Sequence, residues 1–91
     1  MFEFIDRKIE YLEKTSMDID RRIQSKYSEI RILETEISMC DFEEDATSLL
    51  EDIYDLRRDI RTLEDMQYHV LRDIDSLIED RVILGGYADE N

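Results

Sequence analysis

Few side chains in this chain of 91 residues have the type and spacing that catalysis or metal binding requires. His69 is the single histidine and Cys40 the single cysteine, too few for a zinc site built from cysteine and histidine. The Glu-x-x-His spacing of carboxylate metal sites in helical bundles is absent as well. The acidic segment 41–45 has neither the glycine nor the alternating ligands of a calcium-binding loop. We therefore expect a protein that is not an enzyme and uses no metal, cofactor or small-molecule substrate.

Carboxylates are the most abundant charged groups: 25 acidic residues against 12 basic ones give a net charge of −13. Residues 1–40 carry a net charge of −2, whereas residues 41–91 carry −11 (16 acidic against 5 basic residues). Such a chain repels nucleic acid and anionic membrane surfaces, so we expect neither as a direct partner. The second half of the chain contains a candidate acidic face, which either keeps the protein in solution or binds a basic partner: Asp45, Asp52, Asp59, Asp73 and Asp80.

The elements that position these side chains are predicted by two tracks of mainly apolar residues with alternating spacings of three and four. Sustained over five or more heptads, this spacing is typical of coiled-coil α-helices. The first track consists of Phe2, Ile5, Ile9, Leu12, Ser16, Ile19, Ile23, Lys26, Ile30, Leu33, Ile37 and Cys40. The second consists of Phe42, Ala46, Leu49, Ile53, Leu56, Ile60, Leu63, Gln67, Val70, Ile74, Leu77, Arg81 and Leu84.

A turn between the tracks is predicted because they differ in phase by two residues, whereas one continuous coiled-coil helix accommodates insertions of three or four. We predict one domain, residues 1–86, with helices at about 2–39 and 48–84 and a turn at about 40–48. Ser48 and Glu51 have the spacing of a capping box at the start of the second helix. Gly85 and Gly86 predict its end, with residues 87–91 as a flexible C-terminal tail.

The predicted fold is all-α, an antiparallel two-helix coiled-coil hairpin. Pairing residues whose numbers sum to 86 aligns the apolar positions, although it places Glu29 beside Asp59, which repel each other. The isoleucine and leucine positions of the second helix also fit a parallel coil with another copy. Two hairpins that dimerise into a four-helix assembly would satisfy both patterns. The predicted layers include Ile9 with Leu77, Leu12 with Ile74, Ile23 with Leu63, and Ile30 with Leu56.

The second predicted helix carries more apolar surface than one seam requires. Tyrosine, arginine and aliphatic residues alternate beside its seam, a composition typical of protein interfaces. These residues either bind a partner or a second copy, or widen the core of the hairpin itself. The candidate interface consists of Leu50, Tyr54, Arg57, Arg61, Tyr68, Leu71, Ile78 and Val82.

These features favour a protein-protein interaction or assembly module whose partners are itself, as a homodimer or higher oligomer, and an unidentified protein. The alternative is a small acidic inhibitor, for example from a virus, that mimics nucleic acid or otherwise blocks a nucleic-acid-binding protein. A row of acids seven residues apart is sparse for mimicry, since seven helical residues advance about 10.5 Å and phosphates follow at about 3.4 Å. The single cysteine and the lack of an apolar run of about 20 residues lead us to expect a cytoplasmic location.

Overall fold

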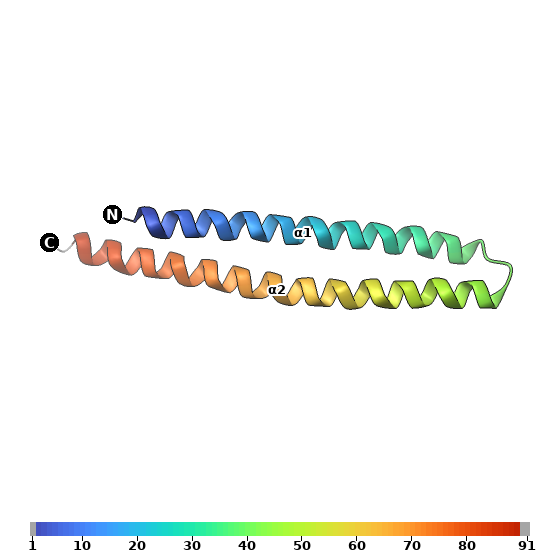
Figure 1. The fold of residues 1–91 in the computed structure, drawn as a ribbon. Coiled ribbons are helices and arrows are strands. Elements are labelled where there is room, and N and C mark those ends of the chain that lie inside the picture. Colours follow the sequence, from blue (N-terminus) through green and yellow to red (C-terminus); the bar gives the residue numbers. More distant parts are fainter. Residues whose placement is uncertain (1, 90–91) are drawn as a thin grey trace.

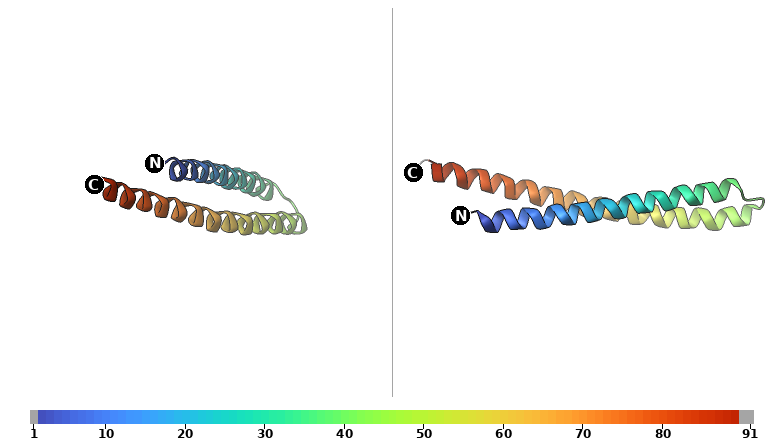
Figure 2. Two further views of the ribbon diagram at one scale, coloured as in Figure 1. Left: turned by 60° about the vertical axis from the view of Figure 1, so that its left-hand side comes forward. Right: turned by 90° about the horizontal axis from the view of Figure 1, so that it is seen from above.

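The computed structural model describes the backbone of residues 2–89 and the side chains up to residue 85. This part of the chain is all-helical and consists of two α-helices, α1 (Glu3–Ser38) and α2 (Glu43–Asp89). The helices lie side by side in opposite directions and form a hairpin, as predicted (Figure 1). The hairpin is a thin rod of 74 × 14 × 14 Å in which the helices wind around each other (Figure 2).

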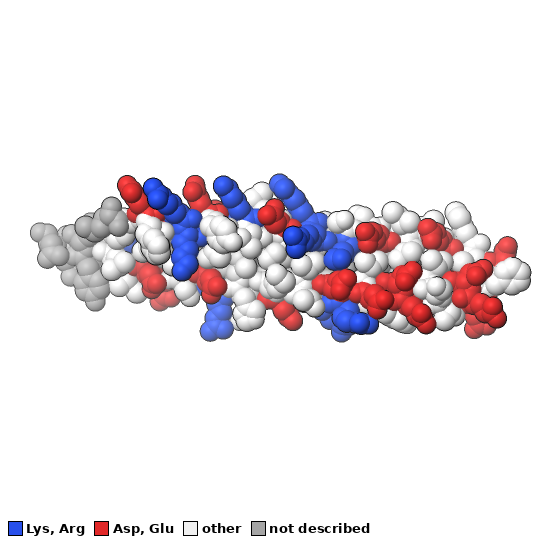
Figure 3. All heavy atoms as spheres, viewed as in Figure 1, with Lys and Arg blue, Asp and Glu red and all other residues white. Residues whose placement is uncertain are grey.

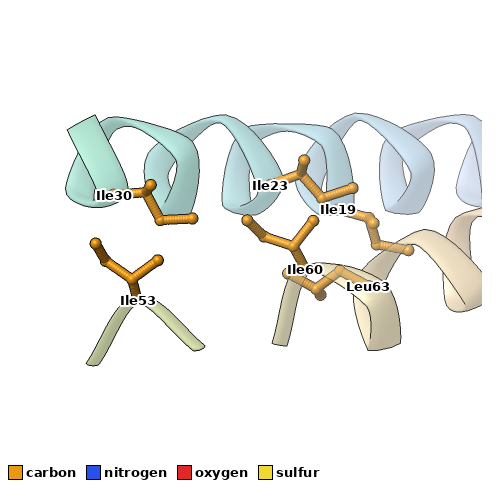
Figure 4. Close-up of a cluster of buried hydrophobic side chains, with 6 residues drawn as sticks. All are labelled: Ile19, Ile23, Ile30, Ile53, Ile60 and Leu63. Carbon is orange, nitrogen blue, oxygen red and sulfur yellow. The ribbon is translucent and has the colours of Figure 1, made fainter. Parts of the chain in front are cut away.

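The core of the hairpin is one seam between α1 and α2. The residues buried there confirm the two predicted apolar tracks. Every buried side chain among the described residues belongs to one of the tracks: Ile19, Ile23, Ile30, Ile53, Ile60, Leu63 and Ile74. Six of them form a continuous cluster in the middle of the rod (Figure 4). Two apolar residues of the predicted seam are exposed instead: Phe42 exposes 71% of its surface and Leu84 exposes 47%. Phe42 lies in the connection and Leu84 near the far end of α2, where the seam no longer covers them.

The alignment of the two helices differs from the predicted register. Gln67 Nε2 donates a hydrogen bond of 2.9 Å to Ser16 Oγ, so residues whose numbers sum to 83, not 86, lie opposite each other. A shift of three residues moves one helix about 4.5 Å along the other, and the predicted register is therefore wrong. Figure 4 shows the same alignment in the apolar layers, with Ile23 opposite Ile60 and Ile30 opposite Ile53.

Polar side chains in the seam account for this alignment. The predicted register would place Gln67 against Ile19 and Ser16 against Val70, leaving two polar groups without partners. An unsatisfied buried polar group costs about 1–3 kcal/mol, whereas the observed register brings the two polar side chains together. It also places Lys26 Nζ 3.5 Å from Asp59 Oδ2, an attractive pair.

The connection between the helices is shorter than the predicted turn at 40–48. The helix α1 ends at Ser38 and α2 begins at Glu43, which leaves residues 39–42. Ser48 lies within α2, so the predicted capping box with Glu51 does not mark the helix start. The earlier start is favourable because Glu43, Glu44 and Asp45 occupy the first turn, where the helix dipole attracts negative charge.

The C-terminal end of α2 also differs from the prediction. The helix continues through Gly85 and Gly86 to Asp89, so residues 87–89 are helical rather than part of a tail; residues 90–91 lie outside the described residues. A glycine ends a helix by adopting positive φ, and no glycine in the described part of the chain does so. The chain contains no proline that would stop the helix after the glycines.

Candidate functional site

The predicted interface residues form an exposed line along α2, which we call the α2 stripe. Each stripe residue directly follows a residue of the α2 track, so the stripe lies about 100° around the helix from the seam positions. The structure leaves all eight exposed, which argues against the alternative that they widen the hairpin core. The exposed fractions of its apolar and aromatic members range from 40% at Leu50 to 68% at Val82. The α2 stripe consists of Leu50, Tyr54, Arg57, Arg61, Tyr68, Leu71, Ile78 and Val82.

A shallow groove accompanies the middle of the α2 stripe. One hollow of about 530 Å³ is lined by Tyr27 of α1 together with Tyr54, Arg57, Arg58, Ile60, Arg61 and Glu64. A second hollow of about 450 Å³ continues from it and is lined by Asp20, Ile23, Gln24, Tyr27, Glu64, Gln67, Tyr68 and Leu71. Tyr27 and Glu64 border both hollows, which therefore form one groove between the helices.

Tyr27 is a residue of this groove that the sequence reasoning did not identify. It directly follows Lys26, a residue of the α1 track, just as each stripe residue follows one of the α2 track. The same offset on α1 gives mainly acids, such as Asp20 and Glu34. The groove therefore combines aromatic, aliphatic and arginine side chains of α2 with Tyr27 of α1, and the carboxylates of Asp20 and Glu64 also line it, so both signs of charge border its apolar surface.

The candidate acidic face lies on the other side of the seam. Its five aspartates, Asp45, Asp52, Asp59, Asp73 and Asp80, are all exposed, and each directly precedes a residue of the α2 track. This position brings the row towards basic side chains of α1. Asp59 pairs with Lys26 at 3.5 Å, and Asp73 lines a hollow together with Lys8.

Acidic side chains on the visible face of the molecule gather towards the end at which the two helices are connected (Figure 3). Lysine and arginine lie mainly over the middle and the other half of the rod. The connection end contains Glu43, Glu44 and Asp45 of the first turn of α2. The strongest negative charge therefore lies near the connection, and part of the aspartate row is balanced by cations of α1.

Polar residues at the seam are paired either with each other or with an aspartate beside the seam. Besides the bond from Gln67 to Ser16, Arg81 Nε lies 2.7 Å from Asp6 Oδ1, and its guanidinium lies 5.9 Å from the centre of the Phe2 ring. Gln67 Oε1 is buried without a hydrogen-bond donor, although its side chain borders the groove. These contacts align the two helices, in agreement with the role of polar seam residues in fixing register.

Side chains that could take part in catalysis or bind a metal ion are dispersed in the described part of the chain. The Cys40 thiol is half-buried and donates to the carbonyl of Glu36 at 3.3 Å. His69 is exposed and packs its ring edge to face with Tyr68, with 5.6 Å between the ring centres. Among the described residues, no three histidine, cysteine or acidic side chains come close enough together to hold a metal ion.

Neither described helix contains a segment with the length and apolar character needed to cross a membrane. Two surfaces of distinct composition lie on the described part of the molecule, the α2 stripe with its groove and the acidic face. Comparison with protein-family models, with curated proteins and with solved structures finds no match to this chain.

Proposed function

We propose that this protein is a non-enzymatic interaction or assembly module that binds helical protein surfaces through the α2 stripe. The observation that supports the proposal is a second line of residues on α2 that the hairpin leaves uncovered. This line has the alternating spacing of three and four of the buried seam, with two positions left open at Glu64 and Asp75, and apolar and aromatic residues dominate it. A helix with apolar residues on such a wide face usually packs against more than one neighbour.

The composition of the α2 stripe supports a binding role over a role in solubility. Tyrosine and arginine are enriched in the energetically important centres of interfaces, and the stripe contains Tyr54, Tyr68, Arg57 and Arg61. Full burial of a leucine or isoleucine side chain stabilises by about 1.5–3 kcal/mol. Since Leu71 and Ile78 are each slightly less than half exposed in the hairpin, covering them would contribute roughly 1 kcal/mol each.

The alternative, an acidic inhibitor that mimics nucleic acid, receives less support. The aspartate row is sparse along the axis, and Asp59 is already paired with Lys26 of the same chain. A mimic would instead present its carboxylates unpaired to the basic groups of the target. We therefore place the binding surface on the α2 stripe. We also propose a reducing, cytoplasmic location, because a chain with a single cysteine has no disulfide within it.

A matched pair of variants tests the proposal. Leu71→Glu/Ile78→Glu places two charges on the α2 stripe. The control, Tyr11→Glu/Ile32→Glu, adds the same charge on α1 at side chains that are 68% and 59% exposed. Immobilised wild-type, stripe-variant and control chains are offered the purified wild-type chain and, separately, an extract of the native host. Circular dichroism confirms that each chain is helical.

The wild-type and control chains should retain a protein that the stripe variant does not retain, because burying an unpaired carboxylate costs several kcal/mol. If all three chains retain the same proteins, binding does not use the α2 stripe. If the wild-type chain retains neither itself nor any protein that the stripe variant fails to retain, the proposed function is wrong.

A further inference from the structure

We propose that the α2 stripe is a self-complementary dimer interface, on which a second copy of this chain binds with its α2 antiparallel and centred on the level of residue 66. This inference rests on the proposed function and specifies its partner. In this arrangement, residues of the two copies whose numbers sum to 132 lie opposite each other. The interface is then the same patch on both chains, as twofold symmetry requires.

The complete line of residues on this face of α2 carries the argument. The α2 stripe has two interruptions, Glu64 and Asp75, which occupy the positions left open in its spacing of three and four. With them, the line runs without a gap from Leu50 to Val82. Apolar side chains occupy both of its ends, whereas most of its charged side chains lie between, with Arg57 in one half and Asp75 in the other.

Antiparallel pairing about residue 66 matches this line with itself. The central pair joins the Tyr68 hydroxyl, a hydrogen-bond donor, to the Glu64 carboxylate, an acceptor. The next pair lays the aliphatic stem of an arginine along a leucine, as long charged side chains do at interfaces. The remaining pairs are one of opposite charge and two that are apolar or aromatic. From the centre outwards, the pairs are Glu64 with Tyr68, Arg61 with Leu71, Arg57 with Asp75, Tyr54 with Ile78, and Leu50 with Val82.

Other alignments match the line less well. A parallel dimer would place Arg57 against Arg57, Glu64 against Glu64 and Asp75 against Asp75, and like charges across an interface repel. An antiparallel alignment one heptad away on one side places Leu50 against Asp75 and Val82 against Glu43. The alignment one heptad away on the other side places Glu64 against Asp75. The antiparallel alignment about residue 66 is the one of these four in which no like charges and no apolar–acid pair meet.

The ionic pair of the proposed interface has no equivalent inside one chain. Arg57 and Asp75 are both exposed, and neither takes part in an ion pair among the described residues. They are 18 residues apart on the same helix, about 27 Å, too far for contact within one chain. Any energetic coupling between these two positions must therefore arise between two chains.

The α2 stripe is long enough for a reversible dimer. Its 32 residue steps extend about 48 Å along α2, and a contact about 10 Å wide would bury roughly 480 Å² per chain, or about 1,000 Å² in total. This area exceeds that of most crystal contacts, about 800 Å², and corresponds to a weak, reversible dimer, since stable interfaces bury about 1,200–2,000 Å². The stripe also stays at a constant angle to the seam along the whole rod, because both have heptad spacing and follow the same supercoil.

A charge exchange between two chains tests the alignment. In a dimer, Arg57→Glu alone places two carboxylates opposite each other at both copies of this contact, and Asp75→Arg alone places two guanidinium groups opposite each other. A mixture of the two variants can form a mixed dimer, in which both contacts are again of opposite charge. Arg72→Glu is the matched control, since Arg72 is also exposed but lies outside the α2 stripe and lines neither hollow of the groove.

A mixed dimer contains two contacts between position 57 of one chain and position 75 of the other. At one contact the introduced glutamate faces the introduced arginine, and at the other the unchanged Arg57 of one chain faces the unchanged Asp75 of its partner. Both contacts of the mixed dimer are therefore of opposite charge, whereas both contacts in a dimer of either single variant are repulsive.

Dissociation constants measured by sedimentation should rise roughly tenfold to thirtyfold for each single variant, given the modest strength of exposed ion pairs. The mixture of Arg57→Glu and Asp75→Arg should return to within about threefold of the wild type, and the mixture of Arg72→Glu and Asp75→Arg should not. Circular dichroism confirms that all variants remain helical. A wild-type dimer with no recovery in the first mixture would overturn this alignment and leave the proposed function standing. A wild-type chain that stays monomeric would overturn self-association. The proposed function would then be tested by whether the α2 stripe captures another protein.

Discussion

Replacement of Ile53 by alanine should destabilise the hairpin strongly, whereas replacement of Phe42 should not. Both residues belong to the same apolar track, but Ile53 is 2% exposed and Phe42 is 71% exposed. Truncation of a buried isoleucine to alanine costs about 2–5 kcal/mol, and a thin two-helix core can collapse around the gap, so we expect about 2–3 kcal/mol. A chain of this length has a total stability of roughly 5–14 kcal/mol, so the loss is a large fraction of it.

The measurement is urea and thermal unfolding followed by circular dichroism at one fixed protein concentration, because association would add to the apparent stability. The melting temperature of Ile53→Ala should fall by about 8–24 °C. For Phe42→Ala we expect a change in stability below about 0.5 kcal/mol. Equal losses in the two variants, or a larger loss for Phe42→Ala, would refute the described position of the connection.

Three further outcomes follow from the described contacts. Alanine substitutions of Ser16 and Gln67 should be non-additive by about 0.5–1.5 kcal/mol in a double-mutant cycle, because the two side chains share a hydrogen bond; additive losses would contradict the register. Gly85→Ala should increase helicity and amide protection near the end of α2, by up to about 1 kcal/mol, since no atom lies within 4 Å of the added Cβ. A loss of helicity would mean that Gly85 ends the helix. Asp59→Asn should lower stability by less than about 1 kcal/mol, and high salt should remove the effect, because the pair with Lys26 is exposed; a loss that persists in high salt would contradict an ionic contribution.

Burial along the seam could be predicted from the sequence because it depends on local spacing. Once a segment is helical, residues three and four apart lie on one face regardless of where the partner helix sits. This is why the two tracks together include every buried side chain of the described residues, Ile53 and Ile60 among them. The exposed positions of Phe42 and Leu84 depend on where the seam ends, and spacing alone does not determine this.

The register could not be predicted from apolar spacing because several alignments of two heptad tracks bury similar amounts of hydrocarbon. The deciding contribution comes from a few polar side chains, above all Ser16 and Gln67, whose direct bond selects one alignment. The helix ends were missed for a related reason. Glycine is the residue type that most often ends a helix, but the backbone at Gly85 does not adopt positive φ, so the helix continues.

The exposure of the α2 stripe agrees with the sequence reasoning, whereas the contribution of α1 to its groove was missed. The residues at the same offset from the α1 track on either side of Tyr27 are polar or charged, namely Asp20, Gln24, Arg31 and Glu34, so no periodic apolar signal marked it. Its contact with the groove becomes visible only when the two helices are aligned. The ion pair of Asp59 with Lys26 likewise depends on the register.

The central claim is that the α2 stripe is an interface between copies of this chain. Sedimentation equilibrium of the full wild-type chain over a range of micromolar concentrations tests it most directly, with Leu71→Glu/Ile78→Glu measured alongside. We predict that the mass of the wild-type species rises with concentration from one chain to two, while the stripe variant keeps the mass of one chain. A wild-type chain that keeps the mass of a monomer throughout, or a stripe variant that dimerises equally well, would contradict the claim.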